Sequence, residues 1–185
     1  MLRMPPKSAE NPTIALLLAA LDPAAEHASS NSENPAARVV AAQARLDVAA
    51  GEGTEHIMML ATGILFAAAA VTEKFAAHQD IEPGELLRRL AEDVPAEGEG
   101  EGLVPRLLRS FFPDEGTDLR TSLKGITQTM AGIWDRSESE FFDLVLHTAA
   151  FAATLATSLI NRRVYTLDEI VKAAEAVLDP TPDPS

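Results

Sequence analysis

Two long stretches of the chain are apolar on every helical face, and this restricts the fold more than any other feature. Residues 54–78 and 138–162 are rich in alanine and show no apolar–polar alternation of the kind that marks a strand. A helix without a polar face is buried by other helices. We therefore expect both segments at the centre of the fold. Their small side chains allow close approach, so they should cross or run antiparallel.

The remaining sequence predicts shorter helices around this pair. Residues 22–33 are expected to be mostly loop, and residues 95–102 are expected to be a glycine-rich acidic linker. Helical spacing of apolar residues and helix-start signals predict further helices over 12–21, 35–50, 83–94, 103–112, 118–134 and 167–178. The sequence thus predicts an all-α fold, a multi-helix bundle of about seven or eight helices around two long Ala-rich central helices.

Helix starts are marked by short capping sequences. In three places an Asn or Asp precedes a proline: Asn11-Pro12, Asp22-Pro23 and Asn34-Pro35. The Asx side chain can accept a hydrogen bond from a free backbone N–H, and proline fits the first helical position because it has no N–H to leave unpaired. Ser137 and Thr166 each stand three residues before a glutamate, which is the spacing of a capping box.

The domain organisation follows from these elements. We expect an N-terminal extension with a short helix over residues 1–33, a single helical domain over 34–178 and a disordered Pro-rich tail over 179–185. A medium, a long and a short helix occur in the same order over 34–94 and over 118–178, which a linker over 95–117 joins. This order favours two similar three-helix units. Their sequence identity is at chance level, however, and any all-helical chain can be divided in this way.

Composition excludes several classes of function. The chain has no cysteine, which excludes disulfide scaffolds, Cys-based metal sites and thiol catalysis. It has 28 acidic against 15 basic residues and a formal net charge of −13, which argues against nucleic acid as a partner because phosphates require a basic surface. The absence of cysteine fits a reducing compartment, so we expect a cytoplasmic protein.

A membrane location is not favoured by either apolar segment. The apolar run over residues 57–71 is shorter than the roughly 20 residues that a spanning helix needs. The run over 141–160 is long enough but contains Asp143 and His147, and ionisable groups are costly inside a bilayer. We expect both segments to be buried helices of a protein that binds no membrane.

One helical face carries residues of the types that bind metals. Glu140, Asp143 and His147 have the spacing i, i+3 and i+7, which places them on one side of a helix. Carboxylates and imidazoles on facing helices hold metals in helical bundles, and Glu55 and His56 would be the nearest further donors. The alternative is a hydrogen-bonded pair of Asp143 and His147 at the edge of the core.

The function predicted from these features is non-catalytic. The chain contains no G-x-S-x-G and no H-E-x-x-H sequence, and no cofactor is predicted. We expect a protein-interaction or regulatory module with a protein partner, acting as a homo-oligomer and most simply as a homodimer. One alternative is a small-molecule or cofactor pocket between the helices, lined by Met58, Met59, Phe66, Trp134 and Phe151. A second alternative is a metal-dependent enzyme that uses the carboxylate and histidine face.

Overall fold

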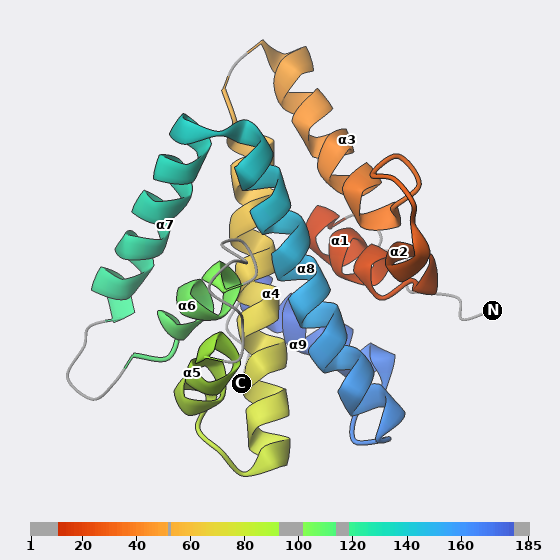
Figure 1. Cartoon of the computed structure of the whole chain (residues 1–185), viewed down its shortest axis with the longest axis vertical. Helices are drawn as coiled ribbons and strands as arrows, with labels where there is room; N and C mark the ends of the chain where they lie inside the picture. The colour runs from red at the N-terminus through yellow and green to blue at the C-terminus, as the bar shows by residue number, and fades with distance from the viewer. Residues whose placement is uncertain (1–10, 52, 93–101, 114–118, 180–185) are drawn as a thin grey trace.

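The computed structural model describes residues 11–51, 53–92, 102–113 and 119–179, and within these ranges the chain forms nine helices and no strand (Figure 1). The helices are α1 (Pro12–Ala20), α2 (Pro23–His27), α3 (Pro35–Ala50), α4 (Glu55–Gln79), α5 (Pro83–Glu92), α6 (Leu103–Arg109), α7 (Leu119–Arg136), α8 (Glu138–Asn161) and α9 (Leu167–Leu178). The prediction of an all-α multi-helix bundle is confirmed.

Helices α4 and α8 cross at the centre of the bundle and share its most extensive helix–helix contact. Both run from top to bottom in Figure 1, so they cross in the same direction and are not antiparallel. Alanines on both helices are buried in the core: Ala67, Ala68, Ala149, Ala152 and Ala156. Their small side chains let the two backbones approach closely, as the sequence predicts.

Both central helices have the length and apolar composition that would allow them to cross a membrane. In α4, however, 67% of the most apolar window is buried inside the fold, which is typical of a core helix. In α8 only 50% of the corresponding window is buried. Helix α8 therefore leaves more of its surface open, and part of that surface lines a groove beside α3.

The three Asx-Pro sequences begin helices as predicted. The side chains of Asn11, Asp22 and Asn34 each accept a hydrogen bond of 2.9 Å from the backbone N–H two residues further on. One of these caps begins a helix inside a segment expected to be mostly loop. Helix α2 occupies five of the residues between 22 and 33, because Asp22 caps it and Pro23 fits its first position.

Helix α1 is part of the central core. Ile14, Leu16 and Leu17 are completely buried, and α1 contacts α3, α4 and α8. Its backbone comes close to α4 where Gly63 faces Thr13. A Cβ atom at Gly63 would overlap the Oγ1 atom of Thr13 and lie 3.2 Å from its Cβ. The absence of a side chain at Gly63 therefore permits this contact.

Several predicted boundaries move by a few residues. Helix α6 ends at Arg109, earlier than the predicted residue 112, and α7 continues to Arg136. Residues 93–94, the predicted end of the helix over 83–94, lie outside the described residues. Residues 95–101 of the linker predicted over 95–102, and residues 180–185 of the tail predicted over 179–185, lie outside the described residues. Helix α9 packs mainly against α4, whereas α5 packs mainly against α6. The division into two similar units over 34–94 and 118–178 remains a prediction.

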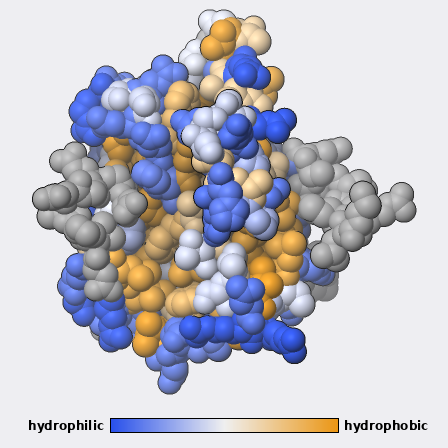
Figure 2. All heavy atoms as spheres, turned by 45° about the vertical axis from the view of Figure 1, so that its right-hand side comes forward, coloured by the Kyte–Doolittle hydropathy of each residue, from blue (hydrophilic) through white to orange (hydrophobic). Residues whose placement is uncertain are grey.

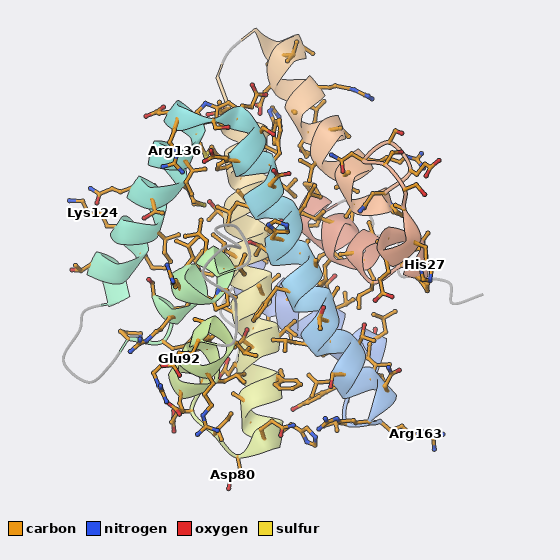
Figure 3. All side chains as sticks on the ribbon, viewed as in Figure 1. His27, Asp80, Glu92, Lys124, Arg136 and Arg163 are labelled. Carbon is orange, nitrogen blue, oxygen red and sulfur yellow. The ribbon has the colours of Figure 1, made fainter. Side chains whose placement is uncertain are left out.

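Charged side chains project from the periphery of the bundle. Lys124 on α7 and Arg163 after α8 point away from the helices (Figure 3). The side of the molecule that carries α1, α3 and α8 differs. Figure 2 brings it forward and shows apolar surface between bands of hydrophilic side chains. This side holds the candidate site.

Candidate functional site

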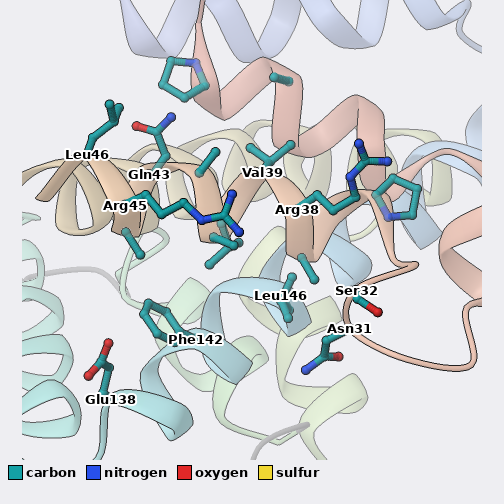
Figure 4. A pocket seen from close by; sticks show the side chains of 18 residues that line it. Asn31, Ser32, Arg38, Val39, Gln43, Arg45, Leu46, Glu138, Phe142 and Leu146 are labelled. Atoms are coloured by element: carbon teal, nitrogen blue, oxygen red, sulfur yellow. The ribbon is translucent and has the colours of Figure 1, made fainter. Parts of the chain in front are cut away.

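An open groove runs between α3 and the beginning of α8, with the start of α1 and residues 31–32 at its edges (Figure 4). Its volume is about 1220 Å³, and 18 residues line it. The larger apolar side chains are Val39 and Leu46 from α3, and Phe142 and Leu146 from α8. Leu46 is 48% exposed, although a leucine is usually inside a fold.

Both helices give this groove an apolar surface because each has more apolar side chains than the core accommodates. Helix α3 buries Ala36 and Val40, which leaves Val39 half-buried and Leu46 exposed. Helix α8 buries Phe141, Leu144 and Val145, so the neighbouring Phe142 and Leu146 lie at the edge of the core. Because the two helices do not close over one another here, the apolar side chains between them stay open to solvent.

The charges of the groove differ from those of the whole chain. Only three charged residues line it: Arg38, Arg45 and Glu138, for a local formal charge of +1 against −13 overall. Arg38 and Ser32 lie toward one end of the groove, and Glu138 lies toward the other end near Phe142 (Figure 4). All three charged side chains are exposed, and none has an ion-pair partner in the described part of the chain.

A buried carboxylate fixes the end of α3 to the beginning of α4. Asp47 is only 6% exposed, and its Oδ1 accepts a hydrogen bond from the backbone N–H of His56 at 2.9 Å. Its Oδ2 accepts one from the backbone N–H of Ile57 at 3.0 Å. Thr54 makes no side-chain cap bond, so Asp47 supplies the cap of α4 from another helix.

The same carboxylate orients an imidazole. Nδ1 of His56 lies 2.8 Å from Oδ1 of Asp47, which leaves Nε2 without a bond to this carboxylate. Burial alone would raise the pKa of Asp47. The hydrogen bonds from the backbone N–H of His56, the His56 ring and the backbone N–H of Ile57 outweigh burial and hold this pKa below its usual value of 3.8. The carboxylate is therefore ionised at neutral pH.

The predicted metal-binding residues do not gather into a cluster. Oε2 of Glu140 lies 2.8 Å from Nη2 of Arg136, and Asp143 and His147 are exposed on α8. Within the described ranges no hydrogen bond joins Asp143 to His147. His56, expected as a further donor, is bonded to Asp47 instead. Across the part of the chain that the structure describes, no three histidine or acidic side chains lie close enough together to hold a metal ion.

The aromatic and Met residues expected to line a small-molecule pocket have other surroundings. The rings of Phe66 and Phe111 pack edge to face with their centroids 4.9 Å apart, and those of Trp134 and Phe141 do so with their centroids 5.3 Å apart. Met59 is 66% exposed. None of the five predicted residues lines the groove or the second cavity. The contacts between aromatic rings are packing interactions of the core edge.

A second cavity of about 1150 Å³ lies where the end of α4 meets α5 and residues 112–113. Its charged residues are partly paired: Oε2 of Glu85 lies 2.8 Å from Nε of Arg88, and Oε1 lies 2.7 Å from Nε of Arg89. The hydrogen bonds from Arg88 and Arg89 lower the pKa of Glu85 to about 2. Such exposed helix pairs are common surface features, so this cavity is the weaker candidate.

The sequence pattern predicted neither the groove nor the Asp47 cap. A signal for the cap was present: a carboxylate between the apolar residues Leu46 and Val48 near the end of α3, a few residues before the next helix begins. Comparison with protein-family models, curated proteins and solved structures gives no match to this chain. A proposal for the function therefore depends on the geometry of the groove.

Proposed function

We propose that the protein is a protein-interaction module that binds a helical segment of its partner in the groove between α3 and α8. The observation that carries this proposal is that partly exposed apolar side chains of both helices line one groove: Leu46 of α3, and Phe142 and Leu146 of α8. A helix with an apolar face binds in grooves of this kind, because its side chains fill the space between the two helices. The proposed location is the cytoplasm, as the composition favours.

The shape of the groove supports a protein ligand over a small molecule. A small-molecule site encloses most of its ligand's surface, whereas this groove is open to solvent, and Leu46 and Ala42 in its lining are exposed. Its charged groups Arg38 and Glu138 lie at its ends, where they reach solvent. An apolar floor with a charged rim is the arrangement found in protein interfaces.

The test uses a photoreactive amino acid that forms a covalent bond with whatever lies against it. Leu46 is replaced by benzoylphenylalanine, and cells that express the full chain are irradiated. A control carries the same probe at Ala131, which is exposed on α7. Adducts from position 46 are identified by mass spectrometry of the joined peptides.

We expect discrete adducts from position 46 and none of the same adducts from position 131. The joined peptides should come from a helical segment with apolar residues at i, i+3, i+4 and i+7, because these side chains face one groove. Equal labelling from both positions, or no adduct from position 46, contradicts the proposal. Circular dichroism of both variants shows that each retains the helical fold.

A further inference from the structure

We infer that the partner of the groove is a second copy of this chain, whose own α3 is the helix that packs against it, so that the protein forms a two-fold symmetric dimer with α3 and α8 of each copy in the interface. This inference rests on the proposed function, because it names the partner of the same groove. Three observations support it: the placement of the charges at the groove ends, the local charge of the groove, and its size.

The charges of the groove are arranged for self-association. Arg38 and Glu138 lie at opposite ends, and neither has an ion-pair partner in the described chain (Figure 4). A two-fold axis that crosses the groove midway exchanges its ends. It therefore places Arg38 of each copy against Glu138 of the other, and one geometry forms two identical ion pairs. A partner without symmetry would need a matching acid and a matching base of its own.

The local charge removes an obstacle to association of such an acidic chain. Two copies that each carry −13 repel one another over most of their surfaces. The groove lining carries +1, because Arg38 and Arg45 outnumber Glu138. Repulsion between two acidic copies is therefore weakest where their grooves face one another. The positive charge of Arg45 is also attracted by the net negative charge of the other copy.

The size of the groove fits a dimer interface. Its 18 lining residues approach the roughly 20–30 residues that each partner contributes to a stable interface of standard size. The apolar residues Val39, Leu46 and Phe142 would form the buried centre, and Arg38 and Glu138 would form the charged rim. Association would also cover Leu46, which is exposed in the single chain.

The test exchanges charges between the two groove ends. The mass of the full chain is measured by sedimentation equilibrium for the wild type, for Arg38→Glu, for Glu138→Arg and for the double variant. Each single change places like charges against one another in both symmetric contacts. We expect the dissociation constant to rise about ten- to hundredfold in each single variant. The double variant restores the opposite charges and should return to near the wild-type value.

A control separates the pairing from the effect of net charge. Arg162 is exposed at the far end of α8, and Arg162→Glu makes the same change in net charge as Arg38→Glu. We expect Arg162→Glu to dimerise as the wild type does. A wild-type mass equal to that of one chain overturns the inference, and so does a dimer that neither single variant weakens or that the double variant does not restore.

The photochemical test separates this inference from the proposed function. Position 46 adducts that join two copies of this chain support both. If position 46 forms adducts only with another protein and the mass is that of one chain, the dimer is overturned, whereas the proposal that the groove binds a protein is supported. An absence of groove adducts together with a monomeric mass overturns both.

Discussion

Asp47 on α3 holds His56 at the start of α4 by two hydrogen bonds, one to its backbone N–H at 2.9 Å and one to its ring Nδ1 at 2.8 Å. The other carboxylate oxygen accepts the N–H of Ile57. A single buried side chain thus caps the longest helix of the described fold and ties α3 to α4. Since α3 is one wall of the groove, Asp47 also helps to set the position of that wall.

Removal of this cap should destabilise the protein. Asp47→Ala leaves the first N–H groups of α4 without acceptors, and we expect the free energy of unfolding to fall by about 2 kcal/mol. Urea denaturation followed by circular dichroism measures the change. Asp143→Ala is the control, because Asp143 is exposed and should change stability by less than about 0.5 kcal/mol. Equal effects of the two changes would show that Asp47 is not a cap.

The stabilisation by Asp47 should depend on pH. The pKa of Asp47 is lower in the folded protein than its usual value of 3.8. Ionised Asp47 therefore makes its full contribution to the free energy of unfolding well above pH 3.8. This contribution is lost as the pH falls through the lower pKa that Asp47 has in the folded protein. The difference in the free energy of unfolding between the wild type and Asp47→Asn should be smaller at about pH 3 than at about pH 5 and should shrink on further acidification. A difference that grows below about pH 4 would contradict this sign.

The contact of Gly63 with Thr13 predicts an unusual response to alanine. Gly63→Ala should destabilise the fold by about 1–3 kcal/mol, because the added methyl group overlaps the Thr13 side chain and pushes α1 away. Gly132→Ala is the matched control. Gly132 lies inside α7 with nothing within 4 Å of an added Cβ, so alanine there should stabilise by about 0.5–1 kcal/mol. Thermal unfolding should show a lower melting temperature than the wild type for Gly63→Ala and a higher one for Gly132→Ala.

The same contact can be tested with a second substitution. Thr13→Ala removes the Oγ1 atom that the new methyl group would meet, so the double variant with Gly63→Ala should lose less stability than the two single changes added together. Additive losses would show that the two residues are not in close contact.

Local signals in the sequence predicted the structure well, because they act between neighbouring residues. Asn11, Asp22 and Asn34 cap the helices that follow them, and Thr166 forms the complete capping box with Glu169. The box predicted at Ser137 is only half formed. Ser137 accepts the N–H of Glu140, but the Glu140 side chain bonds Arg136 instead of returning to Ser137. A nearby arginine thus redirects the glutamate.

Relationships between distant residues were harder to predict. Asp47 reaches His56 because the chain turns at Gly51 and Gly53, both with left-handed backbone angles, and no periodicity in α3 shows where that turn directs the next helix. The apolar pattern would place Leu46 inside and Asp47 outside, yet Leu46 is 48% exposed and Asp47 is 6% exposed. The groove is a result of this inversion, so the sequence pattern alone could not reveal it.

The reactivity of a thiol placed in the groove reports directly on whether two copies cover it. The chain has no cysteine, so Ala42→Cys and Ala131→Cys each carry one thiol at an exposed helical alanine, the first in the groove and the second on α7. The rate of maleimide labelling is followed as protein concentration rises. We predict that labelling at position 42 slows as the dimer forms, while labelling at position 131 stays constant. Rates that stay constant at both positions would contradict a dimer built on this groove.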